Sequence, residues 1–148
     1  MISFDNFVLE GDGPIYLQII RHIKQGIAAG TMADQEEVPS RRVLSALLGV
    51  NPNTIQKAYH LLELEGILLS RSGSKSCICA DPGKRRQIRQ ELLQNDTRNW
   101  VAAMKNLKLT REEALELAQQ IWKENDCMDN GRQTEHNREN DSGGNCRE

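Results

Sequence analysis

Aromatic residues are scarce in this chain of 148 residues, at 4% of the sequence, and long apolar runs are lacking. A membrane-spanning helix needs about 18–20 consecutive apolar residues, so we expect a soluble protein. The N-terminus also lacks a basic segment followed by an apolar one, which is the pattern of an export signal. We therefore expect a cytoplasmic protein without a membrane partner.

Residues typical of catalytic and metal sites are also few. The three histidines lie without clustered carboxylates, so they do not form a metal site. No glycine-rich loop ends in Gly-Lys-Ser/Thr, and the acidic pairs 36–37 and 112–113 have no base or nucleophile beside them. We therefore expect neither an enzyme nor a bound cofactor or metal.

The four cysteines show no zinc-binding spacing: Cys77, Cys79, Cys127 and Cys146. Cys77 and Cys79 are two residues apart on a predicted strand and so point to the same face. They either pair or bind metal there, or they are two small strand residues in a reducing cytosol. We favour the second alternative.

A short helix is predicted at the start of residues 38–76. Pro39 biases the residue before it away from helix, and Ser40 stands at the N-cap, where its hydroxyl accepts from orphan N–H groups. Four apolar residues follow as one predicted stripe: Val43, Leu44, Leu47 and Leu48. Gly49 ends this helix, and Val50 is an apolar residue within the turn.

A second helix begins after the cap Asn51, with Pro52 at its first position. Its predicted inward face is apolar: Ile55, Ala58, Tyr59 and Leu62. Its outer face is polar or cationic and carries no carboxylate: Asn53, Gln56, Lys57 and His60. Glu63 and Glu65 follow only at the C-terminal end. Such an outer face suits hydrogen bonds to DNA base edges or phosphates.

After Gly66, residues 67–71 and 76–80 are predicted strands joined by a turn at residues 72–75. Helix, tight turn, helix and hairpin is the layout of a winged helix-turn-helix, whose second helix enters the major groove. A hairpin with a cationic tip suits a wing along the backbone or in the minor groove. The predicted partner is double-stranded DNA.

The charge distribution supports this partner although the net charge is −2. Residues 39–75 hold five basic and two acidic side chains, a balance of +3, whereas residues 125–148 hold three basic and six acidic ones, a balance of −3. Screening over roughly 8–10 Å lets a local positive face act despite a negative total.

The runs PIYLQIIRHIKQGIAAG and VPSRRVLSALLGVNPNTIQKAYHLLELEGIL resemble the GntR family of bacterial transcription regulators over about residues 14–78. PSRRVL fits the family's Pro-Ser-x-Arg-x-Leu, and LGVNPNTIQKAY fits its turn and recognition helix. Two departures stand out: Gln35 lies where a glycine usually precedes the Leu-Pro-Ser, and Lys75 replaces the second glycine of the wing. The short remainder resembles the YtrA-type subfamily, in which two helices replace a full ligand-binding domain.

The resemblance implies the following DNA contacts: Ser40, Arg42, Asn51, Asn53, Thr54, Gln56, Ser72 and Gly73. From the residue types and positions we add Arg41, Lys57, His60, Arg71 and Lys75 as candidate contacts. Arg42, Asn53, Thr54 and Gln56 are the candidates for base readout. Lys57 and Arg71 are the candidates for phosphate contacts.

The remaining chain divides into regions on either side of this motif. Residues 1–13 are predicted to be an extended arm against their own domain or a partner. The winged helix-turn-helix covers residues 14–80, with a first helix from Pro14 to Gly30 whose apolar face is Tyr16, Ile19, Ile20, Ile23 and Ile27. Residues 81–124 form a helical region, and residues 125–148 are predicted to be a disordered tail.

Two helices are predicted in residues 81–124, the first running to about residue 106, with residues 96–99 as a place where it either continues or breaks. Thr110 and Glu113 form a capping box at the start of the second. The basic residues 84–86 and 89 either contact flanking phosphates or form a solvated face, and we favour the solvated face. The apolar faces exceed what two helices bury on each other, so we predict a homodimer through Leu92, Trp100, Met104, Leu115, Ile121 and Trp122.

We therefore predict a mainly α fold with a small β-hairpin wing, in which a winged helix-turn-helix is followed by two C-terminal dimerisation helices. The predicted function is a sequence-specific transcriptional repressor that binds a palindromic operator as a homodimer. The resemblance implies control of a transporter operon. The alternative is a winged-helix protein-interaction module without specific DNA binding. A small-molecule effector of unknown identity between the dimer helices stays open.

Overall fold

The computed structural model describes residues 4, 7–9, 11, 13–71 and 75–136, with the side chains of residues 71 and 127–136 outside the description. The helices and strands are α1 (Ile15–Ala29), β1 (Glu37–Val38), α2 (Arg41–Leu48), α3 (Pro52–Leu64), β2 (Leu68–Arg71), β3 (Lys75–Ile78), α4 (Pro82–Asn106) and α5 (Arg111–His136). The chain divides into two compact units, residues 1–97 and 98–148. Within the described ranges, no helix is long and apolar enough to span a bilayer.

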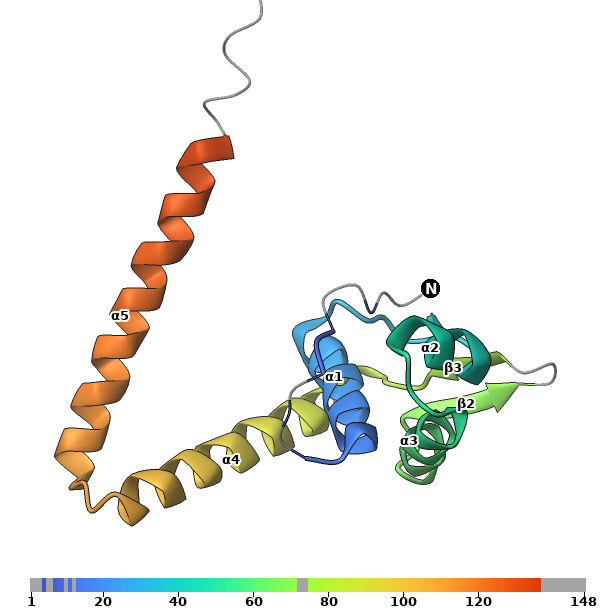
Figure 1. The fold of residues 1–148 in the computed structure, drawn as a ribbon, viewed down its shortest axis with the longest axis horizontal. Helices are drawn as coiled ribbons and strands as arrows, with labels where there is room; N and C mark the ends of the chain where they lie inside the picture. Colours follow the sequence, from blue (N-terminus) through green and yellow to red (C-terminus); the bar gives the residue numbers. More distant parts are fainter. Residues whose placement is uncertain (1–3, 5–6, 10, 12, 72–74, 137–148) are drawn as a thin grey trace, which may run out of the picture. The chain divides into compact units, whose positions relative to one another are not determined.

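Helices α1, α2 and α3 form the core of the first unit, with α3 packed against both others (Figure 1). The predicted isoleucine face of α1 is buried, as is the predicted inward face of α3. Gly30 ends α1 in the left-handed conformation, with φ 80°. Both predicted faces are therefore confirmed, and they position α3 with its other side toward solvent.

The apolar stripe predicted for α2 is narrower in the structure. Only Leu44 is fully buried, Leu48 is half-buried, and Val43 and Leu47 are 54% and 57% exposed. An eight-residue helix offers the core little more than one turn of contact, so residues at its edges stay in solvent.

Two described residues of the N-terminal arm, Phe4 and Phe7, lie against their own domain. Phe4 is buried in the core, and Phe7 is partly buried against it. The His22 ring from α1 is 5.0 Å from each of these two rings, measured between centroids. Of the two alternatives left by the sequence, the structure shows the contact within the chain.

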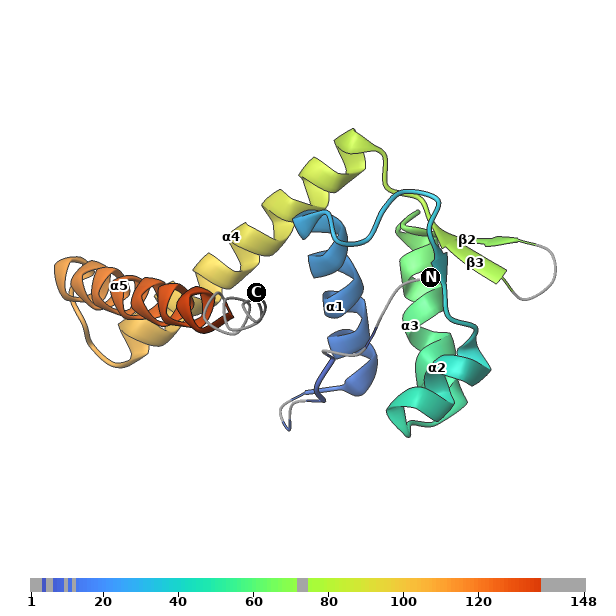
Figure 2. The ribbon, with the colours of Figure 1, turned by 90° about the horizontal axis from the view of Figure 1, so that it is seen from above.

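The wing is a three-stranded antiparallel sheet in the order β1-β3-β2, whereas the sequence predicted two strands. Its strands β2 and β3 lie side by side in Figure 2. The missed strand β1 pairs Glu37 with Cys77 and Val38 with Ser76. In the hairpin, Leu68 lies opposite Ile78 and Arg71 opposite Lys75. Strand β2 begins one residue after its predicted start. Strand β3 begins one residue before its predicted start and ends two residues before its predicted end. Cys77 is buried, and its thiol contacts the Leu69 carbonyl oxygen at 3.8 Å.

Helix α4 continues without a break through residues 96–99, which settles the alternative left open by the sequence. Its first part belongs to the winged-helix unit. Ile88 is buried there, the Lys84 ammonium donates to the Glu65 carbonyl oxygen at 2.7 Å, and Arg21 forms a bidentate pair with Asp96 at 2.8 Å for both contacts. Lys84 thus binds its own chain, while Arg86 and Arg89 are exposed.

The second unit contains the end of α4, a turn, and α5. Lys108 has φ 63°, and Leu109 N–H donates to the Met104 carbonyl oxygen at 3.1 Å, which is a Schellman closure of α4. The predicted capping box is confirmed: Thr110 N–H donates to the Glu113 carboxylate at 2.8 Å, and Glu113 N–H donates to the Thr110 hydroxyl at 3.3 Å. The hydrogen bond from the Thr110 backbone N–H to the Glu113 carboxylate is the main reason that the pKa of Glu113 lies below its usual value.

Helix α5 extends to His136, beyond residue 124, where disorder was predicted to begin. The prediction of disorder was therefore wrong for residues 125–136. An existing helix gains one hydrogen bond per added residue, so it does not require further apolar content to continue. Residues 137–148 of the predicted tail lie outside the described residues.

Candidate nucleic-acid interface

The helix-turn-helix is built from two capped helices and a hydrogen-bonded turn. The Ser40 hydroxyl accepts from Val43 N–H at 3.3 Å, and the Asn51 side chain accepts from Asn53 N–H at 2.8 Å. Gly49 closes α2 with φ 64°, and the Ser45 hydroxyl donates to the Val50 carbonyl oxygen at 2.6 Å. The predicted caps are confirmed, and they hold the start of α3 at a defined angle to α2.

The outer face of α3 is exposed along its length. Asn53, Gln56, Lys57 and His60 are exposed, and Thr54 is half-buried. Asn51 at the cap is also exposed. The two acids near the end of the helix are engaged elsewhere, since the Ser70 hydroxyl donates to Glu63 and Lys24 pairs with Glu65 at 2.5 Å. The face is thus available to a partner and free of carboxylates, as predicted.

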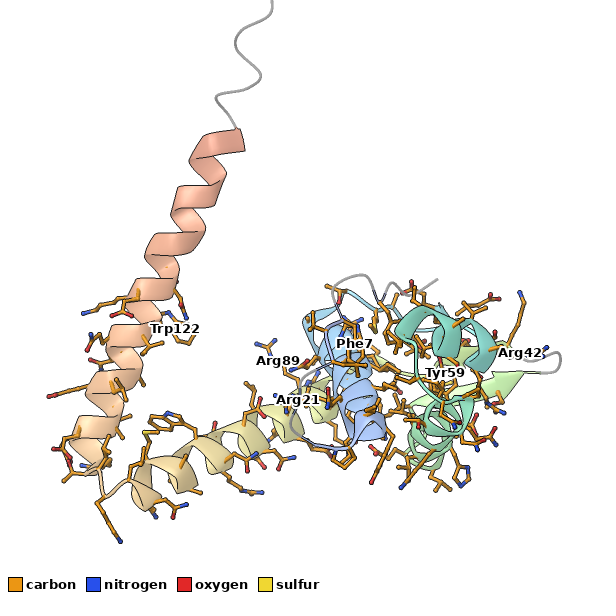
Figure 3. The ribbon with its side chains drawn as sticks, viewed as in Figure 1. Phe7, Arg21, Arg42, Tyr59, Arg89 and Trp122 are labelled. Carbon is orange, nitrogen blue, oxygen red and sulfur yellow. The ribbon has the colours of Figure 1, made fainter. Side chains whose placement is uncertain are left out.

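A cavity of about 410 Å³ opens where the N-terminus of α2, the helix α3 and the sheet meet. Its lining is Ser40, Arg41, Arg42, Tyr59, Ser70, Lys75 and Ser76. Arg42 projects outward from α2 on the side of the β2–β3 hairpin, whereas Tyr59 is buried (Figure 3). The N-terminal N–H groups of α2 add a partial positive charge to the two arginines, so the cavity favours an anion such as a phosphate.

Tyr59 forms the floor of this cavity and joins its two helices. Its hydroxyl donates to the Pro39 carbonyl oxygen at 2.7 Å, directly before the cap of α2. Burial raises the pKa of the Tyr59 phenol well above its ordinary value, although the nearby Arg41 charge acts in the opposite direction. The hydroxyl therefore remains a hydrogen-bond donor throughout the neutral range.

Arg41 and Gln56 form a contact that the sequence did not predict. The Arg41 guanidinium donates through Nη1 to the Gln56 Oε1 at 3.2 Å, which joins the first residue of α2 to the outer face of α3. The two residues are fifteen positions apart and lie on different helices, so no helical periodicity relates them.

Two predicted DNA-contacting lysines have contacts within the chain. The Lys57 ammonium lies 3.8 Å from the centre of the Tyr16 ring of α1, which is a cation–π contact. Lys75 pairs with the Glu37 carboxylate at 3.1 and 3.3 Å, so its charge is matched by an acid of β1. This acid belongs to β1, a strand that the sequence analysis did not predict.

The other candidate DNA contacts of the wing lie at or beyond the limit of the residues that the structure describes. Arg71 is the last residue of β2, and its side chain is outside the described part. Ser72 and Gly73 are outside the described residues.

Of the residues predicted for dimerisation, Leu92 is already used within the first unit, since it packs half-buried against the winged-helix core. Trp100 and Met104 are half-buried. Leu115, Ile121 and Trp122 on α5 are 49%, 48% and 73% exposed. The second unit therefore presents apolar side chains to solvent.

A helix with an exposed, carboxylate-free face, a cationic cavity beside it and a three-stranded wing define a winged helix-turn-helix DNA-binding protein. Residues 15–78 match the family described as bacterial regulatory proteins, gntR family. The HTH-type transcriptional regulator YhcF of Bacillus subtilis strain 168 is 34% identical over 103 residues, which are 70% of this chain and 85% of that protein. The HTH-type transcriptional repressor YtrA of the same organism is 37% identical over 87 residues, which are 55% of this chain and 67% of that protein.

A solved structure of a GntR family transcriptional regulator from Listeria monocytogenes matches with a TM-score of 0.68 at 28% identity, over 76% of this chain and 98% of that one. The chain therefore belongs to the GntR family, and it has the winged helix-turn-helix fold of that family. It is a DNA-binding transcriptional regulator of the YtrA type, and its relatives are regulators rather than enzymes.

Proposed function

We propose that the protein is a repressor that binds a palindromic operator as a homodimer. Two copies of α3 would enter successive major grooves about 34–36 Å apart. The observation that carries this proposal is the exposed, carboxylate-free face of α3 next to a cavity lined by Arg41 and Arg42. The repressor role is supported by the similarity to YtrA, which is named as a repressor.

In this proposal Arg42, Asn53, Thr54 and Gln56 read base edges. The remaining candidates contact the backbone or lie beside it: Ser40, Arg41, Asn51, Lys57, His60, Arg71, Ser72, Gly73 and Lys75. Phosphate contacts from the N-terminus of α2 would place the protein on the duplex, and α3 would then select the sequence. The pairing of Lys75 with Glu37 reduces the expected phosphate contribution of this lysine.

The dimer contact is proposed for the second unit. A groove of about 300 Å³ on α5 is lined by Leu115, Ala118, Gln119, Trp122 and Lys123. A tryptophan that is 73% exposed beside exposed leucines is an apolar surface of the kind that a second copy covers. A two-fold axis through this surface would match a palindromic operator.

The proposal also extends to the regulated genes and to a small-molecule effector. The resemblance to YtrA-type regulators implies control of a transporter operon. An effector would bind between the dimer helices and change the distance between the two wings, because a shift of spacing alters the fit to half-sites one helical turn apart.

The experiment is a fluorescence anisotropy titration of the full chain on the DNA upstream of its own reading frame. Arg42→Ala should cost about 1–3 kcal/mol of binding free energy if Arg42 reads a base. Lys57→Ala should instead weaken all sequences and reduce the salt slope by about one unit. Arg111→Ala is the matched control, because Arg111 is an exposed arginine at the start of α5.

Equal binding of operator and random DNA by the wild type would refute sequence-specific recognition. Unchanged binding by Arg42→Ala would refute the readout role of this residue. A loss of affinity in Arg111→Ala as large as in Arg42→Ala would show that total charge, and not the position in the site, is what matters.

A further inference from the structure

We propose that Arg41 is a specificity-determining positioning residue, which orients the Gln56 side chain so that the recognition helix prefers guanine to adenine at the base that Gln56 reads. The inference rests on the proposed operator binding. Its structural basis is the hydrogen bond from Arg41 Nη1 to Gln56 Oε1, 3.2 Å long, between the start of α2 and the outer face of α3.

The chemistry of the pair decides which atom of the glutamine faces which partner. A guanidinium has five N–H donors and no acceptor, so the glutamine atom that faces Arg41 has to be the carbonyl oxygen. The Gln56 amide nitrogen, with two N–H donors, then remains for the partner. The oxygen keeps one further lone pair.

This orientation has a consequence for base recognition. A glutamine that reads adenine uses both ends of its amide, because the oxygen accepts from N6 and the nitrogen donates to N7. A glutamine whose oxygen is engaged by Arg41 offers mainly donors, and the other N–H groups of Arg41 add more donors beside it. Guanine presents two acceptors, N7 and O6, on its major-groove edge, whereas adenine presents a donor and an acceptor. The pair therefore fits guanine.

The surrounding structure keeps the two side chains together. Arg41 is the first residue of α2, directly after the capped Ser40, and Gln56 follows the fully buried Ile55. The hydrogen bond from Tyr59 to the Pro39 carbonyl oxygen joins the same two helices. Two acids of the same unit have other partners, since Glu37 pairs with Lys75 and Glu63 accepts from Ser70. Arg41 is therefore not drawn from Gln56 by either carboxylate.

The test is selection of binding sites from a random duplex library by the full chain, by four single variants and by the double variant of Arg41→Met with Gln56→Met. Gln56→Met identifies the base position that depends on Gln56. Arg41→Met removes the donor and releases the glutamine oxygen, and Arg41→Lys keeps a donor-only cation. Arg42→Met is the matched control, because it removes the same charge from the next position of α2. Both Arg41 and Gln56 are exposed, so we expect these variants to fold, which thermal melts would verify.

We expect the wild type to select guanine at the position that depends on Gln56. Arg41→Met should shift the guanine-to-adenine preference there by about ten-fold, which is the scale of one bidentate base contact, and leave other positions unchanged. Arg41→Lys should keep guanine, and Arg42→Met should not alter this position. A merely structural role of Arg41 would weaken binding without changing one base preference.

Several results would overturn the inference while operator binding stands: no base position depends on Gln56, the wild type selects adenine there, or Arg41→Met weakens all sequences equally. A shift that persists when Arg41→Met is combined with Gln56→Met would also overturn it, because Arg41 would then read the base itself. If the wild type selects no motif at all, the proposed function fails and the inference fails with it.

Discussion

The hydroxyl of Tyr59 supports a sharp prediction about how the helix-turn-helix is held together. It donates to the Pro39 carbonyl oxygen at 2.7 Å, and the Tyr59 side chain is 1% exposed. Tyr59→Phe keeps the ring and opens no large cavity, but it leaves the carbonyl oxygen of the buried Pro39 without this donor. An unsatisfied buried polar group costs about 1–3 kcal/mol.

The assay is urea unfolding of the full chain at pH 7. With an m-value of about 2 kcal/mol per molar, a cost of about 2 kcal/mol lowers the urea midpoint by roughly 1 M while the m-value stays unchanged. Tyr16→Phe is the matched control, because its half-buried ring keeps the contact with the Lys57 ammonium when the hydroxyl is removed. The base preference of Tyr59→Phe should equal that of the wild type, since the outer face of α3 is untouched.

The pH dependence provides a second measurement of the same bond. Burial raises the pKa of the Tyr59 phenol, so its contribution to stability is fully present below the unfolded value of about 10 and is lost as the pH rises toward the folded value. The stability difference between the wild type and Tyr59→Phe should therefore shrink above pH 10. Equal midpoints for Tyr59→Phe and Tyr16→Phe at pH 7, or a difference that grows above pH 10, would refute the reasoning.

Three further predictions follow from single contacts. Gln35 has φ 64°, so Gln35→Gly should stabilise the chain by up to about 1 kcal/mol in urea unfolding, and a destabilisation would show that the left-handed backbone is not strained. The Arg21 guanidinium holds the pKa of Asp96 below its usual value, so Asp96→Asn should cost only about 0.2–1 kcal/mol at pH 7 for this half-exposed pair. The cost should begin to fall below about pH 4, the unfolded value, and vanish once the pH is below the lowered folded value; a cost that stays constant as the pH falls from 7 into this acid range would contradict this. Trp122→Ser should weaken dimerisation at least ten-fold, as measured by analytical ultracentrifugation. Leu64→Ser is the control, because it replaces a 70% exposed leucine of α3, and it should leave dimerisation unchanged. Equal dimerisation of the two variants would show that the interface does not include Trp122.

Much of the site could be predicted because it depends on short stretches of chain. Residues within about one or two helical turns determine several of its features: the caps Ser40 and Asn51, the closing Gly49 and the two faces of α3. The same holds for the capping box of Thr110 and Glu113. In each case the side chain and the backbone group that it satisfies are neighbours in sequence, so the pattern alone identifies both.

The contacts that the sequence missed join residues far apart in the chain. Strand β1 is only two residues long and exists because it pairs with β3, almost forty residues later. The ion pair of Lys75 with Glu37 depends on the same strand, because β1 carries Glu37. Leu92 was assigned to a dimer surface because its spacing suited one, yet it packs on the core of its own winged helix.

The sequence by itself determined the order of the helices, where most of them begin and end, and which side of α3 faces solvent, because helical periodicity and capping are local properties. Only the tertiary structure decided which cations are engaged within the chain, that Phe4 from the N-terminal arm lies in the core, and that Arg41 holds Gln56. Those outcomes depend on which surfaces meet when the helices pack, and the packing of distant segments is not encoded in the spacing of neighbouring residues.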